Sequence, residues 1–335
     1  MEWTADVTAG DWLRERLDDP WRYTMHDVVP RGYPAYARVF HPVFRERPVG
    51  REWPPEGEDA AARRAWQAFV DDAPEIDTER VRWAEVASAF GTTMHPLAQW
   101  SRLIGRDDPY SSEGAPRDEA GWRYEAPDEG RLVPGELAVL AQTLHTHTTT
   151  PDAGAIAVWE GWGDLVGAKV HPSPGGALFG DIPRGYAEYT PADEATVARH
   201  RSVVYRSLKD VFNNPFRRPV WRSGILSDEI SRGPRLKLPN RDHVLFRGGV
   251  AEFSDPGWIE RMPWRDTRGW SAPQSPSIIW PDDHAWVMVT EIDFDSTIVA
   301  GTPELVEAII ADPRLEAASI PGDAHLWHDA DEVNR

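Results

Sequence analysis

Residues 286–300 read Trp-Val-Met-Val-Thr-Glu-Ile-Asp-Phe-Asp-Ser-Thr-Ile-Val-Ala. Apolar, β-branched and aromatic side chains dominate this stretch, and such residues favour the pleated, partly buried surface of a sheet. We predict a strand over Trp286–Phe294, with Ser296–Ala300 either pairing with it or prolonging it. This stretch is the strongest indication in the chain that the fold is built on a sheet.

Further strands are predicted on both sides of it, at Tyr36–Val43 with Pro42 at its exit, Ala155–Trp159 and His243–Phe246. Helical periodicity and helix-start signals predict helices at Asp11–Leu17, Ala60–Val70, Arg80–Phe90, Pro96–Ile104, Pro134–Leu144, Thr190–Phe212 and Thr302–Asp312. Helices are as common as strands and do not alternate regularly with them. We therefore expect an α+β fold with a modest, mainly antiparallel sheet and several packed helices.

We expect one globular domain over residues 1–335, since no internal repeat or clear boundary divides the chain. Pro, Gly, Asp and Ser interrupt residues 106–131, which are predicted to form a polar loop.

The composition excludes several classes of protein. The chain has 36 basic and 55 acidic residues, a net charge of −19, which disfavours non-specific binding to nucleic acid or anionic membranes. It has no cysteine, no apolar run long enough to cross a bilayer and no signal-peptide pattern at residues 1–6. These features predict a cytoplasmic protein.

The charge is unevenly distributed. Residues 281–335 hold 13 acidic and two basic residues, whereas residues 201–270 hold 14 basic and eight acidic ones. The two stretches either neutralise each other in the folded protein or form a basic face beside an acidic wall. The 17 tryptophans are dispersed along the chain, which favours a structural role for most of them.

The first candidate site is the acidic series Glu291, Asp293 and Asp295. In a strand these three side chains would share one face and could hold Mg²⁺, Mn²⁺ or Ca²⁺, or supply a general acid or base. His284 would join them if its loop folds over the acids. The alternative is a solvated strand face. The sequence indicates no other cofactor. The prediction that the protein binds a divalent metal is based on these three carboxylates alone.

The second candidate is Trp159-Glu160-Gly161-Trp162-Gly163, in which two indoles and a carboxylate could bind a sugar or an amine. We group Trp159, Glu160 and Trp162 with Arg247 as predicted binding residues. The alternative is a strand that ends in a tight turn, with tryptophan anchoring the core.

Three other patterns each have an ordinary structural explanation. Phe216–Arg222 interleaves arginines with aromatics, as in phosphate or single-strand contacts, but the arginines could instead pair with acidic residues. His145 and His147 could begin a zinc site, yet no third ligand follows at a suitable spacing, and a helix end explains them as well. His325, His328, Asp329 and Asp331 are predicted to form a solvated tail.

Several stretches taken together resemble an uncharacterised family of actinobacterial proteins. They are Pro30–Tyr33, Tyr36–Pro42, Arg82–Val86, Trp159–Gly163, His243–Gly248 and Gln274–Thr297. The resemblance covers most of residues 26–320. It implies that both halves belong to one unit and that the stretch over about residues 177–239 is an insertion. It transfers no activity and no catalytic residue.

The sequence leaves open whether the chain is an enzyme. The leading hypothesis is a non-catalytic binding or regulatory protein with an unidentified protein or small-molecule partner, acting through Trp159–Trp162 and Glu291–Asp295. The alternatives are a metal-dependent hydrolase that uses Glu291, Asp293 and Asp295, and a phosphate- or nucleic-acid-binding protein that uses Arg217–Arg222.

Overall fold

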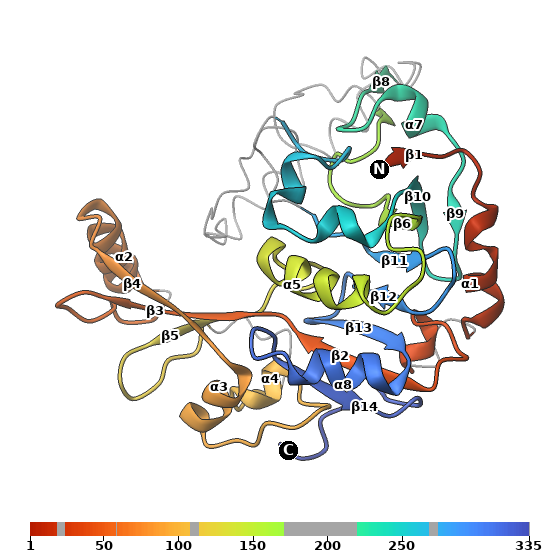
Figure 1. Ribbon diagram of the computed structural model, residues 1–335. Helices are drawn as coiled ribbons and strands as arrows, with labels where there is room; N and C mark the ends of the chain where they lie inside the picture. Colours follow the sequence, from red (N-terminus) through yellow and green to blue (C-terminus); the bar gives the residue numbers. More distant parts are fainter. Residues whose placement is uncertain (19–23, 58, 108–113, 171–219, 268–273, 335) are drawn as a thin grey trace, which may run out of the picture. The chain divides into compact units, whose positions relative to one another are not determined.

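The computed structural model describes residues 1–18, 24–57, 59–107, 114–170, 220–267 and 274–334 (Figure 1). The chain forms two compact units. The first comprises Met1–Trp159, Arg235–Arg261 and Ser275–Arg335, and the second comprises Glu160–Pro234 and Met262–Gln274. No helix within the described residues is long and apolar enough to cross a membrane.

A nine-stranded antiparallel sheet forms the centre of the first unit. Its strands follow the order β1-β10-β6-β11-β12-β13-β2-β14, and β9 also pairs with β10. Their bounds are β1 Glu2–Trp3, β2 Ala35–Phe40, β6 Gly154–Trp159, β9 Leu236–Lys237, β10 Asp242–Arg247, β11 Ile278–Pro281, β12 Val287–Val289, β13 Ser296–Gly301 and β14 Ala317–Ile320. The predicted α+β class with a mainly antiparallel sheet is confirmed.

The stretch 286–300 folds as two short strands joined by a turn. β12 ends at Val289 and pairs with β13, so the prediction that the second segment pairs with the first is confirmed. The prediction of a strand through Phe294 is wrong, because the Phe294 amide donates to the Glu291 carbonyl (3.1 Å) and closes a turn. The three carboxylates therefore do not share a strand face.

Helices bury apolar side chains against this sheet. α8 (Pro303–Ala311) packs on β2, β13 and β14 and contacts α5 (Pro134–His145) (Figure 1). α8 starts as predicted, since the Thr302 hydroxyl accepts from the Leu305 amide (3.3 Å). α1 (Asp11–Arg16) contributes Leu13 to a separate apolar cluster that includes Trp280 and Ile298. The smaller helical turns of this unit are η1 Thr8–Gly10, η2 Met25–Asp27, η3 Val250–Phe253 and η4 Pro256–Glu260.

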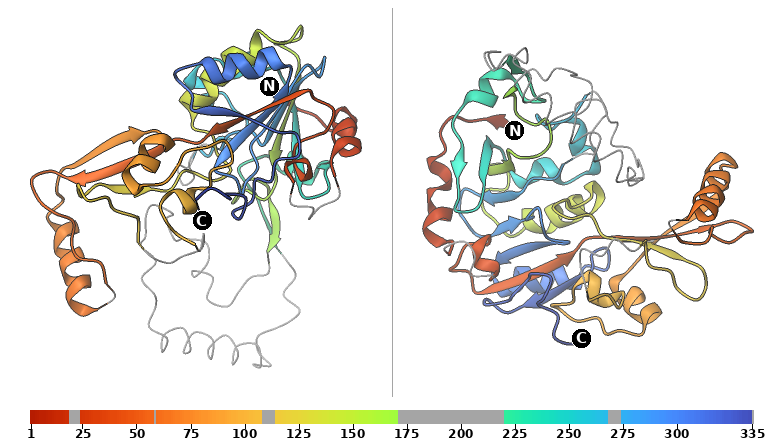
Figure 2. Two further views of the ribbon diagram at one scale, coloured as in Figure 1. Left: turned by 90° about the horizontal axis from the view of Figure 1, so that it is seen from below. Right: turned by 180° about the vertical axis from the view of Figure 1, so that it is seen from behind.

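A second sheet continues from β2 and forms what we call the arm. It consists of the strands β3 (Val43–Pro48), β4 (Ile76–Val81) and β5 (Arg123–Glu125), with the helix α2 (Ala60–Asp71) between β3 and β4. Both figures of the whole chain show α2 at the end of the β3–β4 hairpin remote from the nine-stranded sheet (Figures 1 and 2). Only Ala62 of α2 is buried.

The segment after the arm differs from the prediction in one respect. The helix predicted from Arg80 is wrong at its start, because Arg80 and Val81 pair with Phe44 and Val43 in the arm sheet. The helix that follows, α3, spans Trp83–Phe90, and the short α4 spans Trp100–Leu103. The predicted polar loop 106–131 contains β5, and its residues 108–113 lie outside the described ones.

The second unit contains the hairpin of β7 (Ala168–Val170) and β8 (Val220–Arg222), and the helix α7 (Asp228–Arg232). Leu165 and Leu226 are buried in it. The predicted helix over residues 190–212 and most of the insertion at about 177–239 lie outside the described residues.

Candidate functional site

Two arginines divide the predicted carboxylate series between them. The Arg241 guanidinium donates from Nε to Glu291 Oε1 and from Nη2 to Asp293 Oδ2, each at 2.6 Å. Asp295 instead accepts from Nη2 of the buried Arg38 (2.9 Å). The three carboxylates therefore serve two separate ion-pair centres.

Arg241 also brings the acidic turn to the predicted tryptophan. Its guanidinium carbon lies 5.1 Å from the centre of the Trp159 ring, a cation–π distance. Pairing of β6 with β10 explains this placement, since Trp159 is directly opposite His243 and Arg241 is two residues before His243. We call Trp159, Arg241, Glu291 and Asp293 the Arg241 cluster. It brings Trp159 of one predicted site and Glu291 and Asp293 of the other together with an arginine that the sequence pattern did not single out.

His243 lies beside the Arg241 cluster. Its side chain is buried, and burial lowers the pKa of its imidazole to about 4, with the positive charge of Arg241 acting in the same direction. Its Nδ1 is a buried atom without a hydrogen-bond partner among the described residues. Buried polar atoms nearly always have a partner, so we expect ordered water or a ligand to satisfy this nitrogen.

A second turn adds negative charge to this region. Gly130 has a φ of 67°, and its amide donates to the Phe294 carbonyl (2.9 Å). A Cβ on Gly130 would lie 2.5 Å from the Cα of Ile292, so only glycine allows the two turns to approach this closely. Glu129 has no hydrogen-bond or ion-pair partner in the described part of the chain. Partial burial raises its pKa, and the charges of Asp295 and Asp293 raise it further.

Burial also raises the pKa of Glu291, against the opposing effect of Arg241. Asp293 remains 53% exposed, and Glu129 and Asp128 are exposed as well. The surface around the Arg241 cluster thus combines an indole, a buried neutral imidazole and more carboxylates than arginines.

The described residues contain no group of three or more histidine, aspartate or glutamate side chains arranged to hold a metal ion. His284 does not approach the acidic turn, because it lies in the β11–β12 turn, beyond the opposite end of β12. Its ring stacks on Trp12 with the ring centres 4.3 Å apart. The prediction of a metal site assumed that Glu291, Asp293 and Asp295 share one strand face, and the structure does not place them on one.

The other predicted binding residues, Arg247, Glu160 and Trp162, are not part of the Arg241 cluster. Arg247 pairs with Ala155, four residues along β10 from His243, a separation of about 13 Å. It forms an exposed ion pair with Asp282 (2.8 Å). Glu160 and Trp162 belong to the second unit, in the turn that the sequence predicted after β6.

The arginine and histidine patterns have separate outcomes. Arg217 and Arg218 lie outside the described residues, whereas Arg222 is 3.8 Å from Asp164. His145 is the last residue of α5, and His147 Nδ1 contacts the Thr143 carbonyl (2.9 Å). The helix-end interpretation of this histidine pair is confirmed.

His41 joins the arm to the nine-stranded sheet. Its Nε2 contacts the Thr297 hydroxyl (3.0 Å), and its Nδ1 contacts the Asp128 carbonyl (2.5 Å). A hydroxyl, an imidazole and an orienting oxygen in series is an arrangement that nucleophilic enzymes use. Here His41 and Thr297 are both completely buried, so a substrate cannot reach them. The series is a structural connection at the β2–β3 junction.

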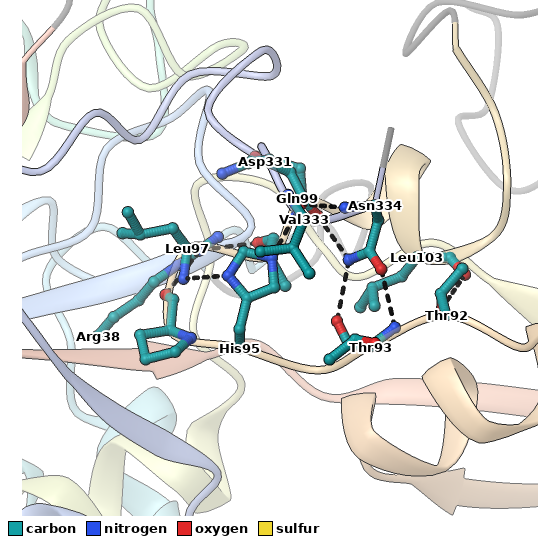
Figure 3. A network of polar contacts seen from close by, with 12 residues as sticks. Arg38, Thr92, Thr93, His95, Leu97, Gln99, Leu103, Asp331, Val333 and Asn334 are labelled. Carbon is teal, nitrogen blue, oxygen red and sulfur yellow. Dashed lines mark hydrogen bonds and ion pairs between the residues drawn. The ribbon is translucent and has the colours of Figure 1, made fainter.

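Asp331 is the clearest difference between the predicted solvated tail and the structure. It is 1% exposed and accepts from His95 Nε2 (2.8 Å) and from the Gln99 amide (3.2 Å). Asn334 extends this network through two hydrogen bonds to the backbone of Thr93 (Figure 3). The prediction is wrong for Asp331, because residues 92–99 supply donors that its own sequence neighbourhood does not reveal.

Sequence reasoning missed Arg241, Glu129 and the role of His243. Arg241 precedes a predicted strand and carries no local signal, and only the β6–β10 pairing places it on Trp159. Gly130 was the local signal that could have pointed to Glu129. An isolated glycine among charged residues is typical of a turn that packs closely against another backbone segment.

Comparison of the chain with protein-family models, with curated proteins and with solved structures found no match. The resemblance to an actinobacterial family therefore stays a prediction.

Proposed function

We propose that this chain is a non-catalytic binding protein that recognises a cationic group of its partner beside the Arg241 cluster. The observation that carries the proposal is the guanidinium of Arg241 itself. It lies over the Trp159 ring between two carboxylates, so this surface already accommodates the type of group that we expect a partner to present.

Charge favours a cation over an anion. Glu291 and Asp293 outnumber Arg241, and Glu129 adds a third carboxylate. Partial burial raises the pKa of Glu129, and repulsion from Asp295 and Asp293 raises it further. An arriving ammonium or guanidinium group would relieve this repulsion. The net charge of −19 would also accelerate association with a basic partner. A basic protein segment is therefore the partner class that we propose, and the cysteine-free composition favours the cytoplasm as the place of binding.

The proposal is tested by calorimetric titration of the protein with octa-arginine at several salt concentrations. Asp293→Asn should weaken binding about fivefold, corresponding to about 1 kcal/mol for a partly exposed ion pair. Trp159→Ala should weaken it as well, because the stacking surface is lost.

Asp323→Asn is the matched control, since it removes the same charge from an exposed position in the same acidic part of the chain. Equal losses for Asp293→Asn and Asp323→Asn would mean that the peptide responds to total charge only, and would refute the site. Absence of binding at low salt would refute the proposed partner class.

A further inference from the structure

The base of the arm is attached to the rest of the first unit through two glutamates. Arg80 of β4 donates from Nη2 to Oε1 of Glu136, which is in the first turn of α5. Glu316, just before β14, accepts from the backbone amides of Trp83 (2.8 Å) and Ala84 (3.2 Å) at the start of α3. Each glutamate therefore binds a residue next to the point where β4 leaves the arm.

The two glutamates hold the arm by charge. A carboxylate at the start of a helix interacts favourably with the exposed amides there, and an ion pair with arginine is stronger than a neutral hydrogen bond. The side chain of Glu136 is 5% exposed, whereas that of Arg80 is 47% exposed. The other carboxylate oxygen of Glu136 is buried without a hydrogen-bond partner in the described residues, so Arg80 alone compensates its charge.

We propose that Glu136 and Glu316 form an acid-sensitive anchor, which holds the base of the arm when both carboxylates are charged and loosens it when they are protonated. The arm, with its exposed helix α2, would then move relative to the nine-stranded sheet as the pH falls.

The electrostatics of the two glutamates support this anchor. Burial raises the pKa of Glu136 to about 7, while Arg80 lowers it and Glu316 raises it. Burial also raises the pKa of Glu316, against the effects of the Trp83 and Ala84 amides and of Arg82 and Arg80. Coupling is reciprocal: because Arg80 lowers the pKa of Glu136, protonation of Glu136 must weaken the Arg80 contact by the same free energy.

No other charged group takes the place of Arg80. The elements that pack against α5 carry Glu252 on η3, Glu260 on η4, and Glu304 and Glu307 on α8, and no hydrogen bond or ion pair joins any of them to Glu136. Within the described chain, the charged groups that act on Glu136 are Arg80 and Glu316.

As pH rises, we expect the arm base to be held more tightly while the contribution of Glu136 to the free energy of unfolding falls. A purely structural role of Glu136 would not give these opposite trends. The folded pKa of Glu136 is raised, so the folded state binds more protons than the unfolded state between pH 4.5 and about 7. The free energy of unfolding contributed by Glu136 therefore falls as pH rises through that window. Protection of the arm base from hydrogen exchange should rise over the same window.

The experiment is native-state hydrogen exchange at pH 6 and pH 8, with protection factors corrected for the intrinsic effect of pH. Protection of residues 76–90 should be about tenfold higher at pH 8 in the unmodified chain, a difference of about 1.4 kcal/mol. In Glu136→Gln, protection of residues 76–90 at both pH values should equal the lower value that the unmodified chain shows at pH 6. Protection of β13 should not change.

Arg80→Met tests the same contact from its half-exposed side, where the substitution leaves the core intact, and it should also remove the pH dependence. Glu79→Gln is the control, because Glu79 lies on the same strand as Arg80 and its ion pair with Arg45 of β3 (2.7 Å) is separate from the anchor. The proposal is overturned if protection of residues 76–90 in the unmodified chain does not change between pH 6 and pH 8. It is also overturned if Glu136→Gln and Arg80→Met retain the change.

Discussion

The two sheets of the first unit have the same antiparallel pairing and different sources of stability. In the nine-stranded sheet, every residue of β11, β12 and β13 is buried. In the arm, four of the six residues of β4 are exposed. Arg45 and Arg47 both lie 4.4 Å from the centre of the Trp122 ring. Apolar burial stabilises the first sheet. The arm also buries Val43 and Val81, and its more exposed part is held by ion pairs and by arginines that cover aromatic rings.

This difference teaches that the arm can be deformed at little cost. Exposed ion pairs contribute about 0–1 kcal/mol each, whereas a fully buried large side chain contributes several times more. The exposed part of the arm is therefore expected to open locally at a lower free energy than the nine-stranded sheet.

The largest effect should come from removing an aromatic ring from the nine-stranded sheet and, separately, from the arm. Trp280 of β11 is 1% exposed, and Trp280→Ala should lower the free energy of unfolding by about 3–5 kcal/mol, because it leaves a cavity in the core. Trp66 of α2 is only half-buried, beside Trp53 and Phe69, and Trp66→Ala should cost about 1 kcal/mol. Urea unfolding measures both, and similar losses would abolish the distinction between the two sheets.

The next effect concerns His41 at the junction between the sheets. Burial lowers the pKa of its imidazole to about 4, so between pH 6.5 and pH 4 the unfolded chain binds a proton that the folded chain does not. The stability that the neutral ring contributes is present above pH 6.5 and is lost as pH falls to about 4, by roughly 3 kcal/mol.

His41→Gln cannot titrate, so its unfolding free energy should fall less over this interval when both proteins are unfolded by urea at each pH. His145→Gln, at the exposed end of α5, should leave the pH profile of the unmodified chain unchanged. An unaltered profile for His41→Gln would show that the junction does not depend on a neutral histidine.

The smallest effect should be confined to the arm. The Asp59 carboxylate accepts from the amides of Ala61 (2.7 Å) and Ala62 (2.8 Å) and so caps α2. Asp59→Ala should destabilise this helix by about 1 kcal/mol and raise hydrogen exchange in residues 61–71 without affecting β13. If exchange rises in β13 as well, the arm and the nine-stranded sheet unfold as one unit.

Local signals in the sequence located α5 and α8, misplaced the start of α3 and were insufficient for many strands. α8 and α5 each begin at a proline, and α8 also has the capping Thr302, so their starts could be predicted. β1 and β9 have two residues each and β12 has three, which is too short for any alternation to be recognised. Their partners lie far away in the sequence, so the extent of the nine-stranded sheet could not be predicted.

The candidate site shows the same limit. Trp159 and the acidic turn were predicted as separate surfaces, and the sequence did not reveal that Arg241 joins them. Asp331 was assigned to a solvated tail because its donors, His95 and the Gln99 amide, are more than 230 residues away. Charged residues acquire their roles from non-local contacts, and a pattern of charges along the chain does not specify them.

The pairing of β2 with β13 has a consequence for biosynthesis. Arg38 and its hydrogen-bond partner Ser296 are 258 residues apart, so β2 leaves the ribosome long before its neighbour exists. At roughly 5–20 residues per second, the interval is on the order of tens of seconds. During that time the apolar residues of β2 have no strand to cover them. The nascent chain is therefore expected to depend on chaperones, and its sheet closes only when the last third of the protein has been made.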